Sequence, residues 1–238
     1  MLTEKFFDDR ATMLAQLHEA LCSQLRHSLT RADAATLFVS GGNEPGPVFR
    51  ALSSAALPWE RISVALVDER WVPPTHDASN ERLVRENLLR DRAAASRFTG
   101  MKTPHELNGE GEAAAVAACN AAYASLPEPW SAALLGMGPD GHTASLFPNA
   151  ETLQGTLDSQ YLCAAMHAPA GGAAGQYLER MTMTPHALLR CEQLFLLITG
   201  EHKRSIYEQA RVATDREKLP ISVFLQQDSI PLTVFWSP

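Results

Sequence analysis

Short apolar runs alternate with helical patterns along this chain, and this alternation constrains its fold more strongly than any other feature. The apolar runs lie at 36–40, 62–68, 132–136, 177–182, 193–199 and 232–236. Helical patterns lie at 8–29, 45–57, 79–90, 110–125 and 203–212, with a further helix opening at Thr184-Pro185. A continuous apolar run such as 193–199 is typical of a strand buried on both faces of a parallel sheet. The chain shows no linker and no internal repeat, so we expect residues 1–238 to form one α/β domain.

The composition excludes several classes of partner. The chain of 238 residues carries 20 Lys and Arg against 27 Asp and Glu, which gives a formal net charge of −7. An acidic chain is poorly suited to bind nucleic acid or an anionic membrane surface, and no run approaches the about 18 apolar residues of a membrane span. The amino terminus, MLTEKFFDDR, lacks the apolar stretch of a signal peptide, so we expect a cytoplasmic protein. An anionic small molecule would need a local cluster of cations to bind here.

The cysteines predict neither a metal site nor a disulfide framework. Cys22, Cys119, Cys163 and Cys191 are widely spaced, and no C-x-x-C pair or matching histidine spacing accompanies them. We therefore expect buried, reduced thiols and no bound metal.

The first segment with chemical potential is 40–45, which reads Ser-Gly-Gly-Asn-Glu-Pro. It follows a predicted strand and precedes a predicted helix, and ligands of open parallel sheets bind at such strand ends. Ser40, Gly41 and Gly42 would leave backbone N–H groups free to approach a phosphate. The alternative is that the glycines only satisfy the turn. A carboxylate facing the same groups would repel phosphate, so we expect the side chain of Glu44 to point away from them.

Two further segments carry charged residues or a histidine at strand ends. Asp68, Glu69 and Arg70 follow an apolar strand, where they form either part of a binding site or a solvated rim. The glycine-rich loop after residue 136 presents Asp140 and His142 together. A histidine is mostly neutral near pH 7, so one beside a carboxylate is a candidate general base. The alternative for this histidine is that it caps the helix that follows.

Two cations complete the set of candidate residues. Arg180 lies beside a predicted strand, and Lys203 lies in the first turn of a predicted helix. A lysine at that position opposes the helix dipole, which favours anions at the amino-terminal end. A phosphate bound between Lys203 and the helix terminus would remove the conflict, so Lys203 is predicted to bind an anion.

Together these segments resemble the 6-phosphogluconolactonase family. The family motif G-x-G-x-D-G-H-T-A-S-L-F-P matches 136–148 at every specified position. The other family motifs are S-G-G-[ST]-T-P at 40–45, D-E-R-x-V-P at 68–73, S-N at 79–80, R-x-T-x-T at 180–184 and G-x-x-K at 200–203. The chain departs from the family at Asn43 and Glu44, where hydroxyl residues are usual. The resemblance runs in order over nearly the whole chain.

The resemblance implies the fold of glucosamine-6-phosphate deaminases and ribose-5-phosphate isomerases, a three-layer, mostly parallel twisted sheet with helices on both faces. It also implies hydrolysis of 6-phospho-D-glucono-1,5-lactone to 6-phosphogluconate in the oxidative pentose phosphate pathway. His142 would take a proton from the attacking water, and Asp140 would orient either the imidazole or the water. Backbone N–H groups or Arg70 would stabilise the oxyanion.

For the substrate phosphate, the expected ligands are the backbone of 40–42, Arg180 and Lys203, while Asp68 is a further candidate for substrate binding. A lactone is already an activated ester, so no metal or organic cofactor is expected. We expect a monomer with a small-molecule substrate as its only partner.

Two alternative functions are weighed against the lactonase. A sugar-phosphate isomerase or deaminase would share the fold, but deaminases carry a glutamate soon after their D-G-H, whereas this chain continues Thr-Ala-Ser-Leu-Phe-Pro. A non-catalytic sugar-phosphate sensor would bind without turnover, and the presence of both Asp140 and His142 argues against it.

Overall fold

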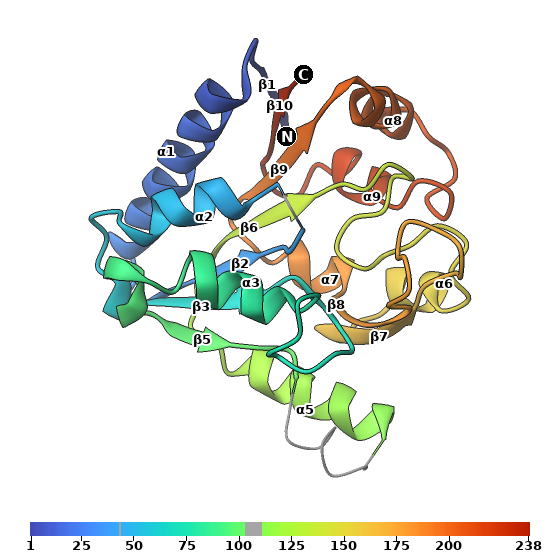
Figure 1. Cartoon of the computed structure of the whole chain (residues 1–238), viewed down its shortest axis with the longest axis horizontal. Coiled ribbons are helices and arrows are strands. Elements are labelled where there is room, and N and C mark those ends of the chain that lie inside the picture. Colours follow the sequence, from blue (N-terminus) through green and yellow to red (C-terminus); the bar gives the residue numbers. More distant parts are fainter. Residues whose placement is uncertain (43, 103–110) are drawn as a thin grey trace.

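The main sheet of the molecule is parallel throughout and runs through its centre (Figure 1). The computed structural model describes residues 1–42, 44–102 and 111–238. Within these residues a seven-stranded sheet has the order β1-β10-β9-β6-β2-β3-β5. Its strands are β1 Leu2–Phe6, β10 Leu232–Ser237, β9 Leu194–Thr199, β6 Trp130–Gly136, β2 Ala35–Val39, β3 Ile62–Leu66 and β5 Arg97–Thr99. The predicted strand at 193–199 is β9, which lies between β10 and β6 and is buried over most of its length.

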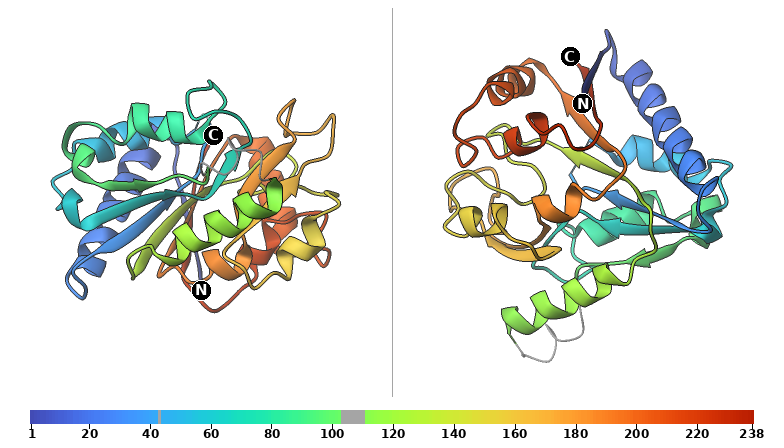
Figure 2. Two further views of the ribbon diagram at one scale, coloured as in Figure 1. Left: turned by 90° about the horizontal axis from the view of Figure 1, so that it is seen from below. Right: turned by 180° about the vertical axis from the view of Figure 1, so that it is seen from behind.

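Helices cover both faces of this sheet (Figure 2). The helices α1 Arg10–Leu29, α2 Gly46–Ser53 and α3 Asn80–Asn87 lie on one face, and α5 Glu112–Ala124 and α8 Glu201–Arg211 lie on the other. The short elements are α6 Leu153–Leu157, α7 Pro185–Leu188, α9 Ser222–Leu225, η1 Trp59–Arg61 and η2 Asp91–Ala95. This arrangement confirms the predicted layered, mostly parallel α/β fold. The amino-terminal residue of the predicted helix 110–125 lies outside the described residues.

A second, antiparallel sheet was not predicted from the sequence. It has the order β4-β8-β7, with β4 Asp68–Arg70, β8 Glu179–Met183 and β7 Cys163–His167. The predicted strand 62–68 therefore divides between the two sheets. Val67 is the junction, because its N–H donates to Val39 O at 2.9 Å and its carbonyl accepts from Met183 N at 2.8 Å. The polar residues after Val67 thus leave the main sheet and enter the small one.

Side-chain caps begin two of the helices, and one of these caps was predicted. Asp9 caps α1 by accepting a hydrogen bond from Thr12 N at 2.8 Å. Thr184 is the N-cap of α7 and Pro185 its first residue, as predicted. All four cysteines are buried and free, which confirms the prediction of buried, reduced thiols. Among the described residues, no helix combines the length and the apolar character that a membrane crossing requires.

Candidate active site

A cavity of about 190 Å³ opens at the carboxyl ends of the central strands. Its walls come from β6, β9, the turn after β2, the small sheet and the start of α8. All the predicted site residues except Asp140 line it, namely Ser40, Gly41, Gly42, Asp68, Arg70, His142, Arg180 and Lys203. These residues are far apart in the sequence, and they meet because parallel strands end at the same edge of the sheet. In the described part of the chain, no group of three or more His, Cys, Asp or Glu side chains is arranged to hold a metal ion.

Asp140 lies behind the histidine in the loop after β6. Its Oδ1 is 2.5 Å from Nδ1 of His142 and also accepts from His142 N at 3.2 Å. Burial raises the pKa of Asp140, but its hydrogen bonds to His142 and the attraction of that ring together outweigh burial, and the pKa falls below its usual value. A carboxylate at Nδ1 keeps a proton on that nitrogen, so Nε2 is left with a lone pair. No described residue is hydrogen-bonded to Nε2 of His142, so this nitrogen can accept a proton from a ligand or a water.

The imidazole of His142 is closely packed. The ring of Phe147 lies 4.4 Å from it, centroid to centroid. A Cβ on Gly138 would lie 2.1 Å from both Cε1 and Nδ1 of the ring and 2.8 Å from Oδ1 of Asp140. The loop therefore requires glycine at 138 to admit the ring, a requirement that the glycine-rich sequence reflects.

Arg70 and Arg180 are opposite residues on the antiparallel strands β4 and β8. Arg180 is 4% exposed and donates to the backbone oxygens of Tyr177 at 2.7 Å and Ala174 at 3.1 Å. Burial lowers the pKa of Arg180 to about 10, with a smaller contribution from the charge of Arg70 against the opposing effect of Asp68. Two adjacent guanidinium groups repel each other, and a bound anion would relieve that repulsion.

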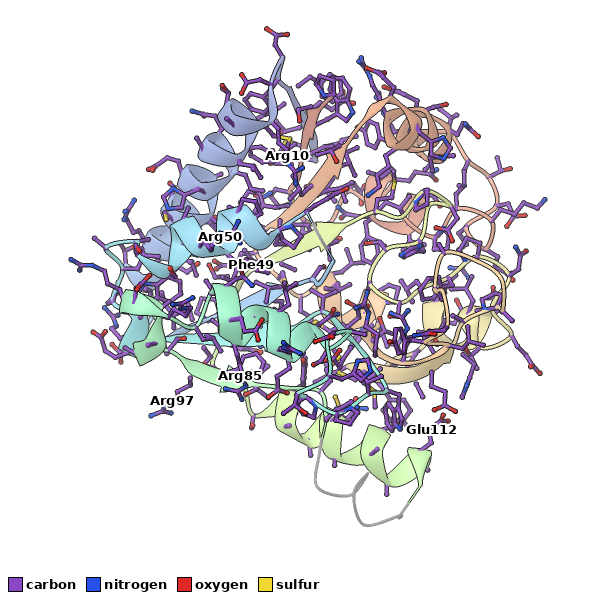
Figure 3. The ribbon with its side chains drawn as sticks, in the orientation of Figure 1. Arg10, Phe49, Arg50, Arg85, Arg97 and Glu112 are labelled. Carbon is purple, nitrogen blue, oxygen red and sulfur yellow. The ribbon has the colours of Figure 1, made fainter. Side chains whose placement is uncertain are left out.

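Arg70 retains donor capacity inside the site. Its NH1 donates to Ala78 O at 2.7 Å, while its buried Nε has no partner among the described residues. Two arginines that do not line the cavity are engaged elsewhere: Arg50 on α2 donates to Asn87 Oδ1 at 2.7 Å, and Arg85 on α3 pairs with Glu81 at 2.8 Å (Figure 3). The cations that line the cavity are thus a distinct set.

Asp68 connects three segments around the cavity. Its Oδ2 accepts from Ser145 Oγ at 2.6 Å, and its Oδ1 accepts from Asn80 Nδ2 at 3.2 Å. Ser145 belongs to the loop that carries His142, and its N–H donates to Thr182 Oγ1 in β8 at 3.2 Å. Asp68 is therefore a structural link between the histidine loop and the small sheet as well as part of the cavity wall.

The sequence left open whether Glu69 contacts a ligand. In the structure its contacts stabilise the fold. It is 1% exposed and does not line the cavity. It accepts hydrogen bonds from Ser79 Oγ and from the N–H groups of Arg70, Asn80 and Glu81, so it caps the start of α3. Burial raises the pKa of Glu69 against the lowering effect of these hydrogen bonds.

Asn80 is a pocket residue that was not named as a site residue from the sequence. Its amide nitrogen donates to Asp68 O at 2.8 Å, which leaves Oδ1 without a hydrogen-bond partner in the described chain. That oxygen lies against Gly41, where a Cβ would be only 1.8 Å away. The signal for Asn80 in the sequence was the Ser-Asn pair at 79–80, which the family resemblance already included.

Ser40 contributes differently from the expectation. Both its N–H and its hydroxyl donate to Leu134 O, at 3.1 and 2.8 Å. Neither donor of Ser40 is available for a phosphate, which corrects the expectation that its backbone would bind one. The N–H groups of Gly41 and Gly42 have no partner in the described residues, so they are the donors that the turn offers.

Glu44 points into the cavity, and the expectation that its side chain would point away was wrong. Its Oε1 lies 2.6 Å from Nζ of Lys203 and accepts from Thr199 Oγ1 at 3.1 Å. The ammonium of Lys203, which projects from the first turn of α8 as predicted, attracts this carboxylate more strongly than solvent does. Asn43 lies outside the described residues.

Parallel α/β architecture with a cation-lined cavity and an imidazole–carboxylate pair defines a class of enzymes that act on small anionic substrates. The family model described as glucosamine-6-phosphate isomerases/6-phosphogluconolactonase matches residues 8–236, so the chain belongs to this family. A 6-phosphogluconolactonase from Rhizobium meliloti is 37% identical over 232 residues, which cover 98% of this chain and 97% of that protein. One from Pseudomonas aeruginosa is 40% identical over 221 residues, with coverage of 92% and 87%.

Solved structures agree with this assignment. A 6-phosphogluconolactonase from Shewanella baltica superimposes with a TM-score of 0.93 at 36% identity, covering 100% of this chain and 98% of that one. A monomeric glucosamine-6-phosphate deaminase superimposes with a TM-score of 0.75 at 14% identity, covering 98% and 96%, and shares the fold.

Proposed function

We propose that this chain hydrolyses 6-phospho-D-glucono-1,5-lactone to 6-phospho-D-gluconate, a step of the oxidative pentose phosphate pathway. The observation that carries the proposal is the imidazole of His142, whose Nε2 has no hydrogen-bond partner in the described chain and which lines a cavity together with Arg70, Arg180 and Lys203. The relatives named 6-phosphogluconolactonase cover nearly the whole chain and support the same activity.

In the proposed reaction, His142 Nε2 takes a proton from water as that water attacks the lactone carbonyl. The tetrahedral oxyanion then collapses, the bond to the ring oxygen breaks, and the imidazolium returns the proton to the leaving oxygen. Asp140 orients the imidazole rather than the water, since its carboxylate binds Nδ1, and it stabilises the imidazolium. General-base help of this kind supplies about 10²–10⁴-fold in rate.

The phosphate of the substrate is proposed to bind the N–H groups of Gly41 and Gly42 together with Lys203 and Arg180. Arg70 is proposed to stabilise the oxyanion, because this residue lines the cavity and its buried Nε has no partner among the described residues. Asp68 shapes the wall that faces the sugar. These roles require no organic cofactor and no metal ion.

The proposal extends to the state of the protein in the cell. We propose one domain over residues 1–238 that acts as a cytoplasmic monomer on a small molecule alone. Sedimentation equilibrium of the purified chain measures its mass directly, and a dimer would contradict the monomer proposal.

The experiment that tests the activity uses lactone generated freshly by glucose-6-phosphate dehydrogenase. Formation of 6-phosphogluconate is followed with its dehydrogenase, and spontaneous hydrolysis is subtracted. We expect turnover by the native chain and a loss of at least about 100-fold in His142→Ala. Ammonia release from glucosamine 6-phosphate is measured in parallel. Ammonia release without lactone hydrolysis would instead identify a deaminase, and ligand-dependent thermal stabilisation without any turnover would identify a sensor.

A further inference from the structure

One ion pair inside the cavity occupies Lys203, the cation that is proposed to bind the phosphate. Nζ of Lys203 lies 2.6 Å from Oε1 of Glu44, and both side chains line the cavity. Lys203 has no other ionic partner among the described residues. A cation that serves a phosphate site is therefore neutralised, in the free protein, by a carboxylate of the same site.

We propose that Glu44 competes with the substrate phosphate for Lys203 and so sets the affinity of the site for phosphate-bearing ligands. This inference rests on the proposed function, in which Lys203 binds the phosphate. It identifies Glu44 as a residue that controls affinity and specificity and that has no part in proton transfer.

The position of Glu44 makes it a direct competitor. It lies just before Pro45, the N-cap of α2, and follows the glycine turn whose N–H groups face the phosphate position. Thr199, at the end of β9, donates to the same carboxylate oxygen and fixes it against the ammonium. A phosphate that reached Lys203 between this turn and α8 would meet a carboxylate held by two donors.

The ion pair can open because neither partner is deeply buried. The exposed fractions of the two side chains are 22% for Lys203 and 21% for Glu44. Arg180, in contrast, is fixed by two backbone oxygens. A phosphate dianion can thus displace Glu44 from Lys203 into solvent, at the cost of two hydrogen bonds, those from Lys203 and Thr199, between partly solvated groups.

The competition acts equally on substrate and product, since both carry the same phosphate. It therefore changes ground-state and transition-state binding together, which raises KM and the dissociation constant of the product without addressing the chemical step. A neutral side chain at 44 would retain the phosphate longer in both complexes. In this proposal the site is lined by cations, but Glu44 lowers its affinity for phosphate-bearing ligands.

The test compares Glu44→Gln and Glu44→Thr with the native chain. Both variants remove the carboxylate, and we expect the KM for the lactone to fall roughly fivefold to tenfold. Isothermal calorimetry with 6-phosphogluconate and with inorganic phosphate is expected to show dissociation constants lower by the same factor. Glu201→Gln is the matched control, because it removes one negative charge from an exposed position in the first turn of the same helix. We expect this control to change neither constant by more than about twofold.

A double-variant cycle isolates the pair. In a Lys203→Met background, Glu44→Gln is expected to have no effect on phosphate binding, because the cation for which the carboxylate and the phosphate compete is gone. The same tightening in both backgrounds would overturn the proposal in favour of general repulsion. A raised KM or weaker phosphate binding in both Glu44 variants, with unchanged thermal unfolding, would also overturn it. Tighter phosphate binding in a chain that hydrolyses no lactone would support this inference while refuting the proposed activity.

Discussion

The amide oxygen of Asn80 occupies the space that a Cβ on Gly41 would need. The separation would be 1.8 Å, and Asn80 is fixed by its hydrogen bonds to Asp68. The glycine turn and the start of α3 therefore meet at a contact that leaves no space for a Cβ. This contact positions the free N–H groups of the turn at the cavity.

Gly41→Ala is expected to displace Asn80 and the turn together. We expect a loss of roughly 1–3 kcal/mol in the free energy of unfolding, as is typical of overpacking a filled site, and a raised KM because the phosphate donors move. Urea unfolding and steady-state kinetics measure the two effects. Gly155→Ala on α6 is the control, since nothing lies within 4 Å of the new Cβ. Equal stability and KM in native and G41A chains would contradict the importance of this contact.

Gly138→Ala is expected to act on the chemical step instead. The new methyl group would overlap the imidazole of His142, so the ring must leave its position against Gly138. We expect kcat to fall by at least about tenfold, since small misplacements of a catalytic group are costly, with a smaller change in phosphate affinity. A raised KM at native kcat would show that the ring does not act on the reacting carbonyl.

Asp140→Asn is expected to lower kcat by about 10²–10⁴-fold, because an amide no longer keeps the required proton on Nδ1 of His142. Steady-state kinetics at several pH values measures this loss. A D140N chain with native kcat would show that the carboxylate only supports the loop.

The lowered pKa of Asp140 also predicts a dependence of stability on pH. A carboxyl group whose pKa is depressed by folding stabilises the protein above its unfolded pKa, and that stabilisation is lost as the pH falls through the folded value. The difference in free energy of unfolding between the native and D140N chains is therefore expected to be full at neutral pH. It should begin to decline as the pH falls below the usual carboxyl value of 3.8 and disappear below the lowered pKa of the folded protein. Denaturant unfolding at a series of pH values measures this difference. A difference that grows in acid would contradict a lowered pKa of Asp140 in the folded protein.

Arg180→Lys is expected to raise KM by roughly 10–100-fold. A lysine cannot reach Tyr177 O, Ala174 O and a phosphate together, and each hydrogen bond to a charged group contributes about 1.5–3 kcal/mol. Limited proteolysis of the loop that contains these two carbonyls should accelerate as well. The control is Arg216→Lys, which keeps an exposed ion pair with Asp158 and should behave as the native chain. A native KM in R180K would show that Arg180 does not bind the substrate phosphate.

Glu69→Gln tests whether the buried carboxylate of Glu69 stabilises the fold or binds the substrate. A carboxamide offers one oxygen and an unwanted N–H₂ to four donors, so we expect a loss of about 2–3 kcal/mol in unfolding free energy. The KM of the folded fraction should stay near the native value, because Glu69 does not line the cavity. A large change in KM with native stability would assign Glu69 to the substrate.

Sequence patterns predicted the parts of this molecule that depend on local chemistry. The apolar run at 193–199, the Thr184-Pro185 helix start and the glycine-rich histidine loop each carry their signal in adjacent residues. β1 and β5 escaped prediction because they lie at the edges of the sheet: β1 is mostly exposed and carries charged residues, and β5 has only three residues. The division of 62–68 at Val67 depends on partners in β2 and β8, which no local pattern reveals.

The site shows the same division between local and long-range determinants. Asp140 and His142 are neighbours in sequence, and their contact follows from a short loop. The orientation of Glu44 depends on Lys203 and Thr199, both more than 150 residues away. The loss of Ser40 as a phosphate donor depends in the same way on Leu134 in the neighbouring strand.

The hydrogen bond between Ser145 and Asp68 ties the histidine loop to the first residue of the small sheet. The loop that carries the imidazole and the strands that carry the paired guanidinium groups are consequently linked into one structural unit. Asn80 in turn joins Asp68 to the glycine turn, so the proposed proton acceptor, oxyanion partner and phosphate donors are held at one spacing. A substrate with a different separation between its carbonyl and its phosphate would therefore be refused.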